Sequence, residues 1–132
     1  MFEPIEIIVG VVVRGNGLGH GFGFPTANIE PQCEVNSADG VYVAEVVIDD
    51  VCHGAVVNIG RSPSVVSLGR RRVEAHIFDF AGDIYGRKVE LLLLKFLRAE
   101  KKFASKEELI TQIASDRDMA EMLYNIRSVS KL

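Results

Sequence analysis

The spacing of apolar residues changes once along this chain, after about residue 98, and that change limits the folds the chain can adopt. Before it lie β-branched runs at residues 5–13, 41–48 and 51–59, the last two flanking a short turn at Asp49 and Asp50, as is typical of strands. No helical segment separates these runs, so they do not fit a parallel sheet with crossover helices. The pattern predicts an antiparallel barrel or sandwich.

Two further runs extend this sheet. Residues 73–80 and 88–97 are strand-like and are separated by turn residues around Gly82 and Gly86. We also expect a short edge strand within residues 64–72, ending in three arginines. The chain therefore carries five or six predicted strands.

The last third of the chain has a helical period. Ser105 and Glu108 form a predicted capping box, in which the Ser105 hydroxyl accepts the Glu108 amide and the Glu108 side chain returns to Ser105. We expect two helical segments within residues 105–126, the second starting near Asp116, lying against the barrel. Their predicted apolar faces are Leu109, Ile110, Ile113 and Ala114, then Met119, Ala120, Leu123 and Ile126.

Composition excludes several classes of protein. The 132 residues suit one domain, and a net charge of −3 argues against a nucleic-acid partner. The longest apolar run, residues 91–94, is far shorter than the ~20 residues of a membrane span. Cys33 and Cys52 suggest no disulfide framework, so we expect a cytoplasmic protein whose thiols are buried or neutral rather than catalytic. We further expect a monomer without a membrane partner.

A glycine-rich loop follows the first predicted strand. Five of the twelve glycines lie between Gly15 and Gly23, and glycine lets backbone amides approach an anion closely. No register of the loop satisfies G-x-G-x-x-G, and the chain has no Gly-Lys pair for a P-loop. A phosphate-covering loop of another architecture and a plain flexible connection both stay open.

Thr26 and Asn28 come directly after this loop and Pro25. Two residues apart on an extended chain, their side chains face the same side. Neutral oxygens beside phosphates suit Mg²⁺. The alternative, which the residues alone favour, is a turn in which both side chains bond to local backbone.

Glu74 is the candidate catalytic residue. Strand alternation predicts that it lies on the opposite face from Val73, Ala75 and Ile77, together with His76, Phe78 and Phe80. A carboxylate so placed can act as a general base toward an alcohol. The alternative is a solvated face on which Glu74 pairs with an arginine. For His76, a packed and hydrogen-bonded position beside Phe78 is favoured over catalysis, and residues 70–72 are interpreted as a solvated basic edge.

These motifs together resemble the riboflavin kinase (flavokinase) family. The resemblance covers about residues 8–124 and rests on four segments. They are Val13-Arg14-Gly15 through Gly23-Phe24-Pro25-Thr26-Ala27-Asn28, Asn58-Ile59-Gly60 with Pro63, Val73-Glu74-Ala75-His76-Ile77-Phe78-Asp79-Phe80 with Asp83-Ile84-Tyr85-Gly86, and Leu97-Arg98-Ala99-Glu100-Lys101-Lys102-Phe103. It implies a six-stranded antiparallel Greek-key barrel over about residues 5–98, a flap over 98–104 and C-terminal helices over about 105–126, in a single domain spanning residues 1–132.

The resemblance also implies an activity: transfer of the γ-phosphoryl of ATP to the ribityl 5′-hydroxyl of riboflavin, giving FMN and ADP. Thr26 and Asn28 correspond to the Mg²⁺ and phosphate ligands, with Mn²⁺ or Zn²⁺ left open, and Glu74 corresponds to the carboxylate that accepts the hydroxyl proton. The residues implied near ATP are Gly15, Gly17, His20, Ile77, Asp79 and Tyr85. Those implied beside the flavin are Arg98, Lys101 and Phe103.

The chain departs from the family pattern at His20, where the family usually carries lysine or arginine. A histidine with an ordinary pKa of ~6.5 is mostly neutral at pH 7 and would hold phosphate less strongly. The sequence also has no His-x-Gly-His motif, so we expect a stand-alone kinase without an FMN adenylyltransferase module. Two alternatives stay open, namely a barrel that binds flavin or nucleotide without turnover, and a kinase that uses CTP.

Overall fold

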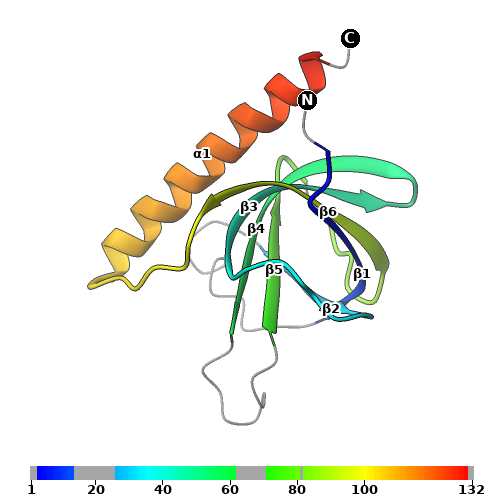
Figure 1. The fold of residues 1–132 in the computed structure, drawn as a ribbon, viewed down its shortest axis with the longest axis horizontal. Helices are drawn as coiled ribbons and strands as arrows, with labels where there is room; N and C mark the ends of the chain where they lie inside the picture. Colours follow the sequence, from blue (N-terminus) through cyan, green and yellow to red (C-terminus); the bar gives the residue numbers. More distant parts are fainter. Residues whose placement is uncertain (1–2, 14–25, 62–70, 81, 131–132) are drawn as a thin grey trace.

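The structure, a computed structural model, describes residues 3–13, 26–61, 71–80 and 82–130. This part of the chain forms six strands and one long helix (Figure 1). The elements are β1 (Glu6–Val13), β2 (Ala27–Pro31), β3 (Gly40–Ile48), β4 (Val51–Arg61), β5 (Arg71–Ile77), β6 (Lys88–Arg98) and α1 (Lys106–Ser130).

The strands close into an antiparallel barrel in the order β1-β2-β5-β4-β3-β6. Strands β3, β4 and β5 follow one another around the barrel, and β6 returns to pair with β3 on the other side. This is the Greek-key arrangement, so the predicted six-stranded Greek-key barrel is confirmed. Helix α1 lies diagonally against the outside of the barrel, in contact with β3 and β4 (Figure 1).

The interior of the barrel is the main core. Val73, Ala75 and Ile77 of β5 point inward, as predicted, because alternate residues of a strand face opposite sides. Leu91 and Leu93 of β6 are fully buried beside them. Each large apolar side chain buried in this way stabilises the fold by roughly 1.5–3 kcal/mol.

A second, smaller cluster lies outside the barrel, under α1. Val41, Val43 and Val56 pack there against Phe78 and the helix residue Ala120. Leu97, Leu123 and Tyr124 cover its edge. This cluster fixes α1 against β3 and β4, so the helix can form one wall of a cavity on the same face.

One strand differs from the prediction. The sixth strand is β2, which the apolar pattern did not indicate because only Ile29 of its five residues is fully buried. Residues 62–70, which hold most of the expected edge strand, lie outside the described residues, and β5 begins at Arg71.

The predicted strand over residues 73–80 is also too long. Strand β5 ends at Ile77, and Asp79 turns the chain with a φ of 51°, a conformation that strands do not adopt. Phe80 therefore packs against the barrel core rather than on the outer face with Glu74.

Helix α1 is continuous, whereas two helical segments were expected. Leu109, Ile113 and Ala120 recur on its inner side at helical spacing, and Asp116 is part of this buried stripe instead of starting a new helix. Met119 and Ile126, expected on the apolar face, are 47% and 56% exposed.

Of the two hydrogen bonds predicted for the capping box at the start of α1, the first forms as predicted and the second has a different donor. The Glu108 amide donates to Ser105 Oγ at 3.2 Å, which confirms the first bond. The Glu108 carboxylate accepts from the Ala104 amide at 3.1 Å and not from that of Ser105.

Cys33 and Cys52 form no disulfide. Both are exposed, so burial, one of the two alternatives expected for these thiols, is wrong, and the other alternative stays a prediction. Within the described ranges, no helix is both long and apolar enough to cross a membrane.

Candidate active site

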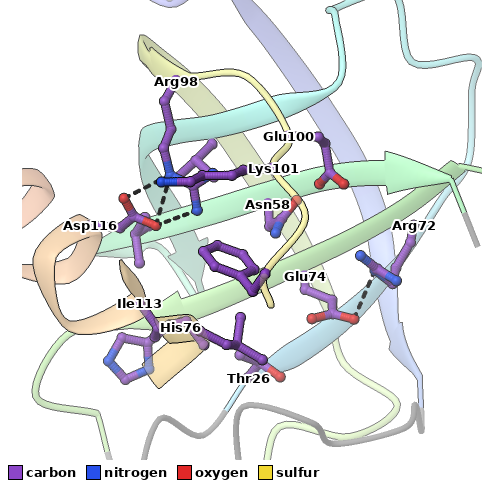
Figure 2. Close-up of a pocket in the computed structure, with 14 residues that line it drawn as sticks. Thr26, Asn58, Arg72, Glu74, His76, Arg98, Glu100, Lys101, Ile113 and Asp116 are labelled. Carbon is purple, nitrogen blue, oxygen red and sulfur yellow. Dashed lines mark hydrogen bonds and ion pairs between the residues drawn. The ribbon is translucent and has the colours of Figure 1, made fainter. Parts of the chain in front are cut away.

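A cavity of about 230 Å³ opens on the outer face of the barrel, beneath α1 and the segment over residues 99–104 (Figure 2). We call it the site cavity. Its walls come from Thr26, just before β2, from β3, β4, β5 and β6, from the 99–104 segment and from α1. The lining residues are Thr26, Val41, Val56, Asn58, Arg72, Glu74, His76, Arg98, Glu100, Lys101, Phe103, Leu109, Ile113 and Asp116.

Glu74 lies in a polar row that crosses three strands. It pairs directly with Asn28 on β2 and with Asn58 on β4. Paired residues on neighbouring strands point to the same face of a sheet, so these three side chains share the outer face. Thr26, two residues before Asn28, lines the site cavity as well. Strand β2 and the residue just before it thus bring two oxygen-bearing side chains near Glu74.

Two side-chain oxygens near Glu74 are buried without a hydrogen-bond partner in the described part of the chain. Thr26 Oγ1 and Asn58 Oδ1 have no hydrogen-bond partner among the described residues. Because a buried unpaired acceptor is costly, such atoms require an explanation. Both line the site cavity beside Glu74 (Figure 2), where a hydroxyl or a cation would satisfy them.

The donor set fits a Mg²⁺ ion that is shared with phosphates. Within the described ranges, no group of three or more His, Cys, Asp and Glu side chains could hold a metal alone. Mg²⁺ commonly takes one or two protein oxygens and completes its shell with phosphate and water. Thr26 Oγ1, which has no partner among the residues that the structure describes, is an oxygen of this kind.

Glu74 carries opposing electrostatic influences. Burial raises the pKa of its carboxyl, the Arg72 guanidinium lowers the pKa, and the charge of Glu100 raises it again, with a net upward shift. Arg72 Nε lies 3.0 Å from Glu74 Oε1. A carboxylate with a raised pKa is a stronger proton acceptor. The two alternatives stated for Glu74 in the sequence analysis therefore apply together: Glu74 pairs with an arginine, and it is also a suitable general base.

Glu100 brings a second carboxylate into the site cavity from the 99–104 segment. Its carboxylate lies against Gly60 of β4, where a Cβ would stand 2.8 Å from Glu100 Oε1. Gly60 pairs directly with Arg72. The absence of a side chain at Gly60 thus leaves room for Glu100 close to the Arg72–Glu74 pair.

The other end of the site cavity is aromatic and cationic. The Arg98 guanidinium and Lys101 Nζ lie 6.0 and 5.7 Å from the centroid of the Phe103 ring. Val41, Val56 and Ile113 contribute apolar surface nearby. Such a combination suits a flat heterocycle with polar edges.

A β-bulge directs Arg98 toward α1. Tyr42 pairs with Phe96 but Val41 pairs with Arg98, so Leu97 is an extra residue in β6. A bulge re-aims the side chains that follow it. Here Leu97 packs in the cluster under α1, and Arg98 reaches Asp116 of the helix.

Comparison with known proteins identifies the family. A model of the riboflavin kinase (flavokinase) family matches residues 4–124. The chain belongs to the riboflavin kinase family.

Curated relatives of this chain carry riboflavin kinase in their names. The bifunctional riboflavin kinase/FMN adenylyltransferase of Escherichia coli (strain K12) is 40% identical over 120 residues, which are 90% of this chain and 38% of that protein. The RNA-binding riboflavin kinase RibR of Bacillus subtilis (strain 168) is 41% identical over 112 residues, 85% of this chain and 48% of that protein. The chain thus spans less than half the length of these relatives.

A solved structure shares the fold of this chain. The crystal structure described as a macrolide-efflux protein from Streptococcus pneumoniae superposes with a TM-score of 0.80 and 35% identity. The match covers 89% of this chain and 38% of that chain.

The structure places only some of the residues predicted for a riboflavin kinase site together. Thr26 and Glu74 line one part of the site cavity, and Arg98, Lys101 and Phe103 line another. Asn28 pairs with Glu74 but is not among the lining residues.

Three residues predicted near the nucleotide do not line the site cavity. The side chain of Ile77 is buried in the barrel core, and that of Asp79 is 85% exposed, with its carboxylate 4.0 Å from Arg117. Tyr85 is half-exposed in a turn, where its amide donates to Asp83 Oδ1 at 2.9 Å. Gly15, Gly17 and His20 lie outside the described residues, so these nucleotide contacts stay predictions.

His76 agrees with the structural role predicted for it. Its Nε2 accepts a hydrogen bond from Arg117 Nε at 3.2 Å, and its ring lies edge to face with Phe78 at 6.2 Å. It lines the site cavity from the β5 side.

Arg72, Glu100 and Asp116 line the site cavity but were not predicted as site residues. The interpretation of the arginine run as a solvated edge is wrong for Arg71 and Arg72, which form ion pairs with Asp39 and Glu74. The local sequence around Glu100 did not indicate a role in the site. Asp116 interrupts an apolar stripe of the predicted helix, and a charged residue at such a position could have indicated a buried ion pair.

Proposed function

We propose that this protein is a riboflavin kinase that transfers the γ-phosphoryl of ATP to the ribityl 5′-hydroxyl of riboflavin, giving FMN and ADP. The observation that carries the proposal is the position of Glu74, a largely buried carboxylate with a raised pKa, beside Thr26 Oγ1 and Asn58 Oδ1, which have no hydrogen-bond partner among the described residues. Family membership and the names of the relatives support it.

In this proposal Glu74 is the general base. Phosphoryl transfer asks a protein mainly to position the reactants and to neutralise charge, with one residue orienting the nucleophile. Glu74 accepts the proton of the attacking hydroxyl, and Arg72 holds the carboxylate in place through the 3.0 Å contact. Thr26 and Asn28 would hold Mg²⁺, for which Mn²⁺ or Zn²⁺ could substitute. When bound, the metal neutralises charge on the phosphates.

The aromatic end of the site cavity would take the flavin. Phe103 offers a ring face, and Arg98 and Lys101 offer donors for the polar edge of the isoalloxazine. The apolar wall formed by Val41, Val56 and Ile113 covers its other side. The ribityl chain would then run from Phe103 toward Glu74.

The nucleotide would lie at the end of the site cavity near Thr26. The loop that contains Gly15, Gly17 and His20 would cover its phosphates, and Ile77, Asp79 and Tyr85 would lie near it by family resemblance. The remaining proposals are a single catalytic domain spanning residues 1–132, a monomer, a cytoplasmic location and no nucleic-acid or membrane partner. The RNA binding in the name of the Bacillus subtilis relative belongs to that protein.

The test is chromatography of riboflavin incubated with MgATP and the protein, with Glu74→Gln in parallel. We expect FMN from the wild type and little FMN from Glu74→Gln, which still binds riboflavin. Glu30→Gln is the matched control, because Glu30 is an exposed carboxylate on the same sheet, and it should leave FMN formation unchanged.

Absence of FMN with MgATP, CTP, Mn²⁺ and Zn²⁺ would refute the kinase. If riboflavin still bound, a flavin-binding barrel without turnover would replace it. FMN formed only with CTP would retain the reaction and change the donor.

A further inference from the structure

A network of side chains joins the segment after β6 to α1 at the aromatic end of the site cavity. Asp116 accepts from Arg98 through both of its carboxylate oxygens, at 2.9 Å from Nε to Oδ1 and 2.7 Å from Nη2 to Oδ2 (Figure 2). Gln112 Nε2, one helical turn before Asp116, donates to Oδ1 at 2.9 Å. The Asp116 carboxylate therefore has three nitrogen donors from two elements.

This ion pair is largely removed from water. The side chains of Asp116 and Arg98 are 11% and 22% exposed. When one partner of such a pair is removed, the other is left as an uncompensated charge, which strongly disfavours the original arrangement. Arg98 is thus expected to leave its position when Asp116 is neutralised.

The same network sets the surroundings of Phe103. Arg98 and Lys101 both approach its ring, at 6.0 and 5.7 Å from the centroid. Lys101 Nζ donates to Gln112 Oε1 at 3.5 Å, and Arg98 Nη1 donates to the Ala99 carbonyl at 3.0 Å. Each of the two cations beside the ring is therefore held by α1.

We propose that Asp116, assisted by Gln112, is a positioning residue that holds Arg98, and through it residues 98–103, in the arrangement that receives riboflavin. This inference rests on the proposed function. A segment fixed before the ligand arrives loses less conformational entropy on binding, so the arrangement increases affinity for the flavin. The nucleotide end of the site cavity, near Thr26, does not depend on this network.

If Asp116 only held α1 against the barrel, its substitution would change the binding of riboflavin and of MgATP to the same extent. The chain offers a matched control in the Arg71–Asp39 pair. There Arg71 Nε and Nη2 donate to Asp39 Oδ1 at 3.0 and 2.7 Å, and neither residue lines the site cavity. Asp39→Asn therefore removes a similar ion pair elsewhere in the fold.

The experiment compares Asp116→Asn, Gln112→Leu and Asp39→Asn with the wild type. Riboflavin Kd is measured from the quenching of flavin fluorescence without nucleotide, and KM is measured for riboflavin and for MgATP. For Asp116→Asn we expect the Kd and KM for riboflavin to rise about tenfold, since hydrogen bonds to charged groups contribute roughly that factor. We expect the KM for MgATP to change less than about twofold. Gln112→Leu should shift riboflavin binding in the same direction by a smaller factor, and Asp39→Asn should leave it unchanged.

Three results would overturn the inference: an unchanged riboflavin Kd in folded Asp116→Asn, equal increases in both KM values, or the same loss in Asp39→Asn. If Asp116→Asn does not fold, Gln112→Leu decides by the same criteria. If the wild type binds riboflavin but forms no FMN, the proposed function fails, and the comparison of Kd values still decides the role of Asp116.

Discussion

Arg72 and Glu74, two residues apart on β5, form an ion pair inside the site cavity, with 3.0 Å between Arg72 Nε and Glu74 Oε1. Burial and the neighbouring Glu100 act against the ionised form of Glu74, whereas Arg72 favours it. The proton affinity of the candidate base is thus set by burial and by two neighbours of opposite charge, on β5 and on the 99–104 segment. Each neighbour can be changed separately.

Glu100→Gln should lower the pKa of Glu74, because it removes a nearby negative charge that disfavours ionisation. A base is active when deprotonated, so the acid limb of the pH profile of kcat/KM should move to lower pH. The measurement is FMN formation across pH at limiting riboflavin, with Glu30→Gln as the control. A limb that stays in place or moves upward would show that Glu100 does not act on Glu74.

Arg72→Met should have the opposite effect. Without the guanidinium, burial and Glu100 act on Glu74 unopposed, and its pKa rises further. The acid limb should then move to higher pH, and activity at a pH below the limb should fall. The comparison is with Arg61→Met, a change at a largely exposed arginine on β4. Equal pH profiles for Arg72→Met and the wild type would contradict the role assigned to the pair.

Gly54→Ala should weaken the attachment of α1. A Cβ at Gly54 would lie 2.6 Å from the Tyr124 ring, inside the packed contact between β4 and the helix. Overpacking of this kind costs about 1–3 kcal/mol of the free energy of unfolding, which urea titration measures. The double variant with Tyr124→Ala should lose much less than the sum of the two single losses. Additive losses would show that the two residues do not press on each other.

Glu6→Gln should destabilise the protein in a pH-dependent way. Burial alone would raise the pKa of Glu6, but hydrogen bonds from Ser37 and Asn36 and the charge of Arg71 outweigh it and lower the pKa below 4.5. The folded state therefore gains stability from ionised Glu6 above pH 4.5 and loses it as the pH falls through the folded pKa. The difference in Tm between Glu6→Gln and the wild type should be largest near pH 7 and shrink in acid. A difference independent of pH would mean that packing, not charge, is lost.

The sequence was sufficient for the strands and helix whose apolar residues repeat. Val73, Ala75 and Ile77 are buried as alternation requires. The pattern failed at β2, where a single apolar residue, Ile29, faces the core. Such a strand exists because its neighbours β1 and β5 supply both edges of its hydrogen bonding, and a local pattern contains no information on those partners.

The candidate site likewise contains residues that could be predicted from the sequence and residues that could not. Thr26 and Glu74 could be named from the sequence because they lie in short motifs. Asn58, Glu100 and Asp116 could not be assigned roles, since each acts on a residue of another element that only the barrel brings near. Asn58 meets Glu74 through the β4–β5 register, and Asp116 meets Arg98 through the bulge in β6.

The closing seam of the barrel joins β1 to β6, with Glu6 opposite Leu93 and Ile7 opposite Leu92. During synthesis on the ribosome, β1 is made first, and its pairing with β6 can form only after β6 has been synthesised. Pairing between segments so far apart in sequence slows folding, because the entropy of a long loop is lost before any contact across the seam is gained. We expect β3, β4 and β5, which are joined by local connections, to associate before the seam closes. The aromatic end of the site cavity would be assembled last, when α1 docks on the completed barrel.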